Sequence, residues 1–158
     1  MAPPKKTPMK QISTYLLTAT VAGLFMTGCK PKPEPIVLGK DECAECKMII
    51  ADPKFGGEIV SKKGKVYKFD DPHCIAVFLE RRGIELNNIS RTLFVNYNEP
   101  HDLIDVKNAE FVVSSQMKGP MGGNSGAFNG RKAAEQKSAE ISGSRVTDWA
   151  TLYNILVK

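Results

Sequence analysis

The sequence predicts an α+β domain in which two small, related ββαβ halves form one compact unit. The first observation is residues 57–69, where apolar and polar residues alternate on both sides of a glycine-containing turn, as in a β-hairpin. The second is a recurrence, because Phe69 and Phe128 are each followed by an Asx residue and a helical segment. We expect the halves to span residues 41–98 and 99–158.

The first half has the clearest local signals. The two hairpin strands meet at a turn over residues 62–64. An Asp-Asp-Pro sequence then supplies a cap and a first-turn proline, which predicts a helix over residues 72–82. Residues 92–97, rich in β-branched and aromatic side chains, predict the next strand. The order of the first half is therefore ββαβ.

The second half repeats this plan less clearly. Its Gly- and Pro-rich stretch, residues 116–126, is predicted to be a loop. Asp148 can cap a last amphipathic helix that begins with Trp149. The other predicted elements are strands over residues 102–105 and 110–114, a polar helix over 131–141 and a turn or short strand over 143–146.

The first 28 residues are typical of a bacterial lipoprotein signal peptide. Lysines precede an uncharged apolar run that is short for a membrane-spanning helix. The run ends in Leu-Phe-Met-Thr-Gly-Cys, which resembles a lipobox and makes Cys29 the predicted lipidation site. Residues 29–40 are then expected to be the lipidated cysteine and a flexible Pro/Lys tether. The alternative is a soluble secreted protein with a leftover thiol.

Charge and motifs exclude several classes. The net charge of +5 includes three lysines of the signal peptide, so the mature chain is only mildly basic. No arginine cluster is interleaved with aromatic residues, and nucleic acid is not an expected partner. The chain also lacks a Ser/His/Asp arrangement, an acid-base pair of carboxylates and a phosphate-binding loop with its lysine. We therefore expect a protein that is not an enzyme.

Sulfur is concentrated in two segments. Cys43, Cys46 and Met48 lie within six residues of one another, and the Gly-rich loop carries Met117 and Met121. A Gly- and Pro-rich loop is not a core element, so its methionines favour a ligand-binding loop. The alternative is a flexible surface turn with incidental methionines.

Three chemistries could use these sulfurs. A C-x-x-C motif suits a thiol-disulfide oxidoreductase, but no convincing strand precedes it here. Zinc would draw on His73 and Cys74, yet neighbouring helical residues point about 100° apart. Cu(I) is soft and prefers thiolate and thioether donors. In an extended segment Cys46 and Met48 would share one side, and Met121 could approach from across the fold. Met48 could instead be a core residue.

Three motifs together are similar to the NosL family, Cu(I)-binding lipoproteins that accompany nitrous oxide reductase. They are C-x-x-C-x-M at residues 43–48, Phe-Asp-Asp-Pro-His-Cys at residues 69–74 and Gly-Pro-Met-Gly at residues 119–122, followed by Ala127-Phe128. The similarity spans about Glu42 to Trp149, and the family also has two related ββαβ halves.

The resemblance implies a function and a ligand set. It implies a membrane-anchored Cu(I) metallochaperone of the bacterial cell envelope that faces the periplasm. Such a protein delivers copper for assembly of the copper sites of nitrous oxide reductase, with a dedicated ABC-type transporter complex. The alternative is a periplasmic C-x-x-C oxidoreductase. The implied ligands are Cys46, Met48 and Met121, with Cys43 as a second thiolate, Cys74 as an auxiliary ligand or buried thiol, and Met117 as a substitute.

Overall fold

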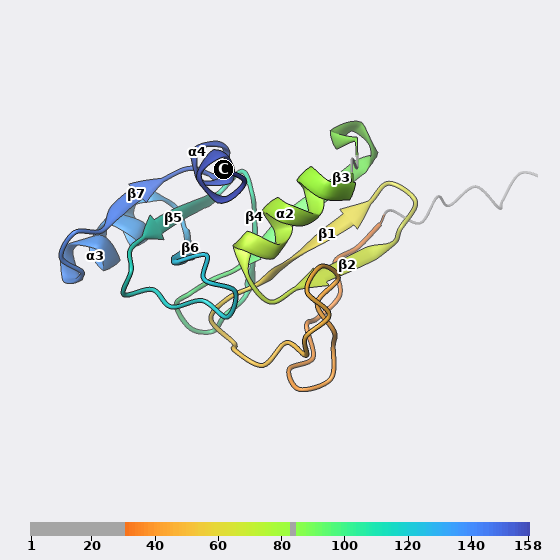
Figure 1. Cartoon of the computed structure of the whole chain (residues 1–158), viewed down its shortest axis with the longest axis horizontal. Coiled ribbons are helices and arrows are strands. Elements are labelled where there is room, and N and C mark those ends of the chain that lie inside the picture. Colours follow the sequence, from red (N-terminus) through yellow and green to blue (C-terminus); the bar gives the residue numbers. More distant parts are fainter. Residues whose placement is uncertain (1–30, 83–84) are drawn as a thin grey trace, which may run out of the picture. The chain divides into compact units, whose positions relative to one another are not determined.

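Two antiparallel sheets and three α-helices make up the computed structural model, which describes residues 31–82 and 85–158 (Figure 1). The prediction of a mixed α+β fold is confirmed. No helix in these two ranges has the length and apolar character needed to cross a membrane. The predicted signal peptide and Cys29 lie outside the described residues.

The first sheet has the strand order β2-β1-β3-β4. The sheet strands are β1 (Gly57–Ser61), β2 (Val66–Phe69), β3 (Ile89–Val95) and β4 (Leu103–Asp105), and β3 follows a short 3-10 helix, η1 (Leu86–Asn88). Helix α2 (Pro72–Arg82) packs on this sheet through Phe78, whose ring centroid lies 5.1 Å from those of both Tyr67 and Phe69. The predicted hairpin and helix are both present.

The second sheet has the order β6-β5-β7. Its strands are β5 (Ala109–Val113), β6 (Ser125–Asn129) and β7 (Arg145–Thr147), and the helices are α3 (Arg131–Glu140) and α4 (Trp149–Leu156). Each half therefore has the element order ββαβ, and in each sheet the first strand of the half lies between its second and third. The predicted internal repeat is present at the level of topology.

Two details of the second half differ from the prediction. The strand predicted over residues 102–105 pairs with β3 as β4, so it extends the first sheet and does not begin the second. Strand β6, with the sequence Ser-Gly-Ala-Phe-Asn, was not among the predicted strands. A Cβ at Gly126 would lie 2.6 Å from Met117 Cε and 2.8 Å from the Tyr97 ring, so close packing requires glycine there. Tertiary contact outweighs strand propensity at this position.

One hydrophobic core joins the halves. Phe94 of β3 and Phe111 of β5 are both fully buried, and their ring centroids are 4.8 Å apart. Trp149 of α4 packs against both rings, with its ring centroid 4.6 Å from that of Phe94 and 5.8 Å from that of Phe111. Tyr97 N, in the segment after β3, also donates a hydrogen bond of 2.7 Å to Ala127 O in β6. The halves therefore share a core and are not separate domains.

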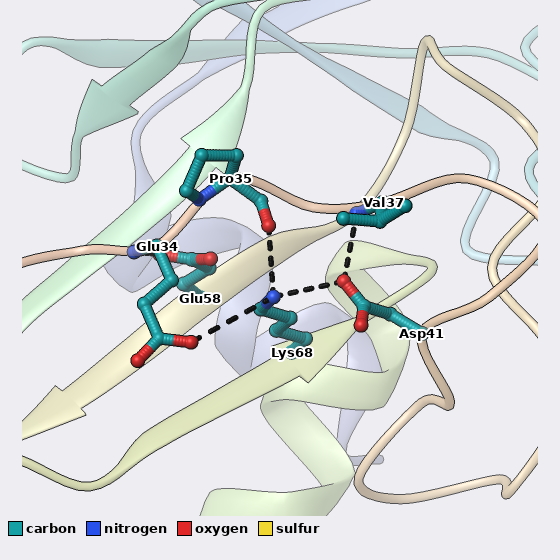
Figure 2. Close-up of polar contacts among 6 residues, drawn as sticks. All are labelled: Glu34, Pro35, Val37, Asp41, Glu58 and Lys68. Atoms are coloured by element: carbon teal, nitrogen blue, oxygen red, sulfur yellow. Dashed lines mark hydrogen bonds and ion pairs between the residues drawn. The ribbon is translucent and has the colours of Figure 1, made fainter.

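The end of the predicted tether is fixed on the first sheet (Figure 2). The Lys68 ammonium on β2 donates to Pro35 O and to Asp41 Oδ2, both at 2.8 Å. The Glu34 backbone N–H donates to Glu58 Oε2 at 3.2 Å. The composition of residues 29–40 predicts a flexible tether throughout, but from Glu34 onward these contacts hold the segment against β1 and β2. The long-range contact to Lys68 could not be read from the local composition.

Candidate metal centre

A tight turn carries the first two cysteines. Glu42 and Ile49 form an antiparallel bridge, and inside it Cys43 N donates to Met48 O at 2.8 Å. Lys47 has a φ of 66°, in the left-handed region, and its N–H donates to Cys43 O at 3.1 Å. The turn is fixed to β2, because Ala44 N donates to Lys68 O at 2.7 Å.

This turn corrects the prediction that Cys46 and Met48 lie on one side of an extended segment. The left-handed Lys47 between them reverses the chain, so the alternation of side chains in a strand does not apply. Cys43 is fully buried, Cys46 is half-buried, and Met48 is 54% exposed. Met48 is therefore a surface side chain. The alternative interpretation, that Met48 is a core residue, is wrong.

The second contribution comes from the end of β2 and the start of α2. Asp70 follows the last residue of β2, and Cys74 lies one helical turn further on. Both side chains are almost completely buried. Asp71 caps the helix, since its Oδ1 accepts from His73 N at 2.7 Å.

Together these segments form a cysteine–aspartate cluster, defined by Cys43, Cys46, Asp70 and Cys74. One donor atom from each residue lies within 4.8 Å of the other three. Cys74 Sγ donates to Asp70 Oδ1 at 3.3 Å, and Cys46 Sγ donates to the same oxygen at 3.6 Å. All three cysteines are free thiols. Four convergent donors of this kind can hold a metal ion.

The thiols differ in their readiness to ionise. The pKa of Cys43 is lowered to about 6, chiefly by the neighbouring Cys74 thiol and also by the backbone N–H groups of Cys46, Asp70 and Glu45. The pKa of Cys46 is raised to about 11, mainly by burial. The pKa of Cys74 is raised, first by its hydrogen bond to Cys43 and then by burial. Of the three thiols, Cys43 is therefore the one whose ionisation its neighbours favour.

The Gly-rich loop reaches this region through Asp71. We call residues 119–123 the methionine loop. Met121 N donates to Asp71 Oδ2 at 3.1 Å, and the half-buried Met121 side chain packs against the same core that contains Cys43 and Cys74. Met117, in contrast, is fully buried in a smaller core cluster with Val112, Phe128 and Ala134. Met117 is thus a packing residue.

The structure brings some predicted site residues together and adds one. It places Cys43 and Cys46 in one cluster with Cys74, which was predicted to be an auxiliary ligand or a buried thiol, and it adds Asp70. Asp70 was interpreted only as part of a helix cap. The available signal was its spacing of four residues from Cys74, which places two donors on one side of a helix start.

The fold and the cluster define a small α+β domain with a sulfur-rich site that can hold a metal ion. The sequence matches the NosL family over residues 36–154, so the chain belongs to the NosL family. The predicted family resemblance is confirmed.

Two relatives agree with this assignment. The chain is 29% identical over 150 residues to the copper-binding lipoprotein NosL of Stutzerimonas stutzeri, an alignment that covers 85% of this chain and 76% of that relative. The crystal structure of the copper chaperone NosL from Shewanella denitrificans superposes with a TM-score of 0.64 at 25% identity. That match covers 76% of this chain and 94% of the other.

Proposed function

We propose that this protein binds one Cu(I) ion as cargo at the cysteine–aspartate cluster and passes it on for assembly of the copper sites of nitrous oxide reductase. The observation that carries the proposal is the convergence of the Cys43, Cys46 and Cys74 thiols within 4.8 Å. The names of the two relatives, a copper-binding lipoprotein and a copper chaperone, support copper as the metal.

The donor set suits Cu(I). A soft monovalent ion with a low coordination number is satisfied by two or three sulfurs, with Met121 as an available thioether. Cys43 provides the first thiolate, because its sulfur is already stabilised by hydrogen bonds. Binding at Cys46 and Cys74 displaces their protons, and Asp70, which accepts from both thiols, is the nearest proton acceptor.

The exposures of the donors favour transfer over storage. Cys43 and Cys74 are buried, whereas Cys46 is half-buried and Met48 is exposed two residues further on. Copper would therefore enter and leave at the Cys46 edge of the cluster. The exposed Met48 thioether would be the first sulfur to meet a protein that brings or receives copper. Transfer by ligand exchange breaks and forms only metal–ligand bonds, so no catalysed reaction is required.

The cellular setting is part of the same proposal. A lipid on Cys29 would anchor the folded domain to a membrane of the bacterial envelope, facing the periplasm, which accords with the lipoprotein name of one relative. The client would be nitrous oxide reductase, and the ABC-type maturation complex would assist. Nucleic acid has no place in this function.

The alternative function, a thiol-disulfide oxidoreductase, rests on the lowered pKa of Cys43 beside a second thiol. Its weakness is access, because the side chain of Cys43 is fully buried and an attacking thiolate must reach a substrate disulfide. A metal ion, in contrast, can be bound by donors that are buried, provided that one edge of the site is accessible.

A competition titration tests the proposal. The reduced full chain is titrated with Cu(I) against a chromophoric chelator, alongside Cys43→Ser, Cys46→Ser and Cys74→Ser. We expect one tight equivalent, weakened at least tenfold by each substitution, because serine is a poor donor for a soft ion. A parallel titration with Zn²⁺ tests whether the site prefers Cu(I) to zinc.

Weak Cu(I) binding, or substitutions that leave it unchanged, would contradict the proposal. Tight zinc binding with weak Cu(I) binding would identify a different metal. A reversible disulfide between Cys43 and Cys46 in a protein that binds no copper would favour the oxidoreductase.

A further inference from the structure

The Asp71 carboxylate joins two segments that lie 50 residues apart in the sequence. Its side chain is fully buried. Oδ1 accepts from His73 N at 2.7 Å, inside the first turn of α2, and Oδ2 accepts from Met121 N at 3.1 Å, in the methionine loop. Each carboxylate oxygen thus serves a different segment.

The loop is shaped to fit this carboxylate. A Cβ at Gly119 would overlap Asp71 Oδ2, and a Cβ at Gly123 would overlap Asp71 Oδ1. Neither glycine has a positive φ, whereas Gly122 between them does, at 73°. Gly119 and Gly123 are therefore required for close approach to Asp71 and not for backbone conformation.

Asp71 is also linked directly to the cysteine–aspartate cluster. It lies between Asp70 and Cys74 in the sequence, and its backbone carbonyl accepts from Cys74 N at 3.0 Å. The same residue therefore contacts the helix turn that carries two donors and the loop that carries Met121.

We propose that Asp71 is a positioning residue that holds the methionine loop against the start of α2, so that the Met121 thioether can join the sulfurs bound to copper. This inference rests on the proposed function and names a residue that controls it without binding the metal. A carboxylate suits the role, because both of its oxygens accept from backbone N–H groups. An asparagine offers only one acceptor oxygen and places an NH₂ group against the other N–H.

The contact is tested first without metal, by amide hydrogen exchange of the full chain with Asp71→Asn. Asparagine is as good a helix cap as aspartate, so the start of α2 is expected to be retained. The Met121 amide should exchange at least tenfold faster in the variant. Lys118→Gln, a change at an exposed neighbour of the loop, is the control and should leave that rate unchanged.

The functional consequence is tested by Cu(I) competition titrations on four proteins: wild type, Met121→Leu, Asp71→Asn and the double variant. We expect each single substitution to weaken binding about tenfold. We expect Met121→Leu to add less than twofold in the Asp71→Asn background, because the thioether is no longer delivered. The same four-protein comparison is then repeated with Gly123→Ala in place of Asp71→Asn. Gly123→Ala leaves Asp71 intact and displaces the loop.

The outcomes are distinguishable. A full tenfold penalty of Met121→Leu in both altered backgrounds would overturn the positioning role, as would an unchanged Met121 exchange rate. Wild-type Cu(I) binding that is insensitive to Met121→Leu would also overturn it, while leaving the thiol site intact. Only the absence of tight Cu(I) binding in the wild type would overturn the proposed function itself.

Discussion

At the scale of single residues, the cluster depends on side chains whose roles are unequal. Cys43 was predicted as a second thiolate from its motif position, and its neighbours lower its pKa, whereas those of Cys46 and Cys74 are raised. Asp70 was interpreted as a helix cap, the usual role of an Asp before a helix, although its spacing of four residues from Cys74 was a signal. Met48 could not be placed, because nothing local indicates that Lys47 adopts a left-handed conformation. For Met48 the missing information is tertiary.

Glu58 gives a residue-scale prediction about pH. Its carboxyl group is fully buried on β1, and its Oε1 has no hydrogen-bond partner among the described residues. Burial raises its pKa to about 7, against the opposing effect of the Glu34 N–H and the Lys68 ammonium, while Glu34 and Asp41 add to the rise. The folded state therefore binds this proton more tightly than the unfolded state.

The sign follows from that difference. Between the unfolded pKa of about 4.5 and the folded value, raising the pH removes a proton that stabilises the folded state, so the free energy of unfolding falls. We expect Glu58 to contribute a fall on the order of 2 kcal/mol between pH 5 and pH 7.5. Urea unfolding of the metal-free protein measures it. Glu58→Gln should show a flatter profile, and identical profiles would refute the assignment.

At the scale of elements, local signals were sufficient where an element is defined by its own sequence. Alternation gave the β1–β2 hairpin, and the Asp-Pro start gave α2, with bounds of Pro72–Arg82 as predicted. Strand β6 was missed because its small residues have low strand propensity. Strand β4 was found but assigned to the wrong half, because which strand pairs with which depends on contacts distant in sequence.

Gly57 tests how closely the strands of the first sheet approach. A Cβ at this position would overlap the Leu93 carbonyl oxygen of β3, and a backbone atom cannot move aside easily. We expect Gly57→Ala to lower the free energy of unfolding by about 2–3 kcal/mol. The matched control is Gly64→Ala in the hairpin turn, which meets open space but has a φ of 86°. It should cost about 1 kcal/mol. A cost at Gly57 no larger than that at Gly64 would contradict the steric limit set by the Leu93 carbonyl oxygen.

At the scale of the whole molecule, the two ββαβ halves behave as one unit because their cores are continuous. The repeat was visible in the sequence as an aromatic residue, an Asx and a helix, but the shared core was not. It depends on Phe94 and Phe111 meeting across the two sheets, with Trp149 against both. Such contacts between halves leave no periodic pattern in the sequence.

Cooperative unfolding is the corresponding prediction. Phe111→Ala should lower the free energy of unfolding by about 3–4 kcal/mol, because a fully buried aromatic ring is lost at the junction of the halves. Fluorescence of Trp149, the single tryptophan, and far-ultraviolet circular dichroism should report the same transition in wild type and variant. Two separate transitions in the wild type would mean that the halves fold independently.

The most direct test of the central claim is X-ray absorption spectroscopy at the copper edge of the Cu(I)-loaded protein, compared with the Cys74→Ser variant. The proposed site predicts a first shell dominated by sulfur, with fewer sulfur scatterers when Cys74 is replaced. A first shell of nitrogen and oxygen alone, or a sulfur shell that is unchanged by Cys74→Ser, would contradict the assignment of copper to the cysteine–aspartate cluster.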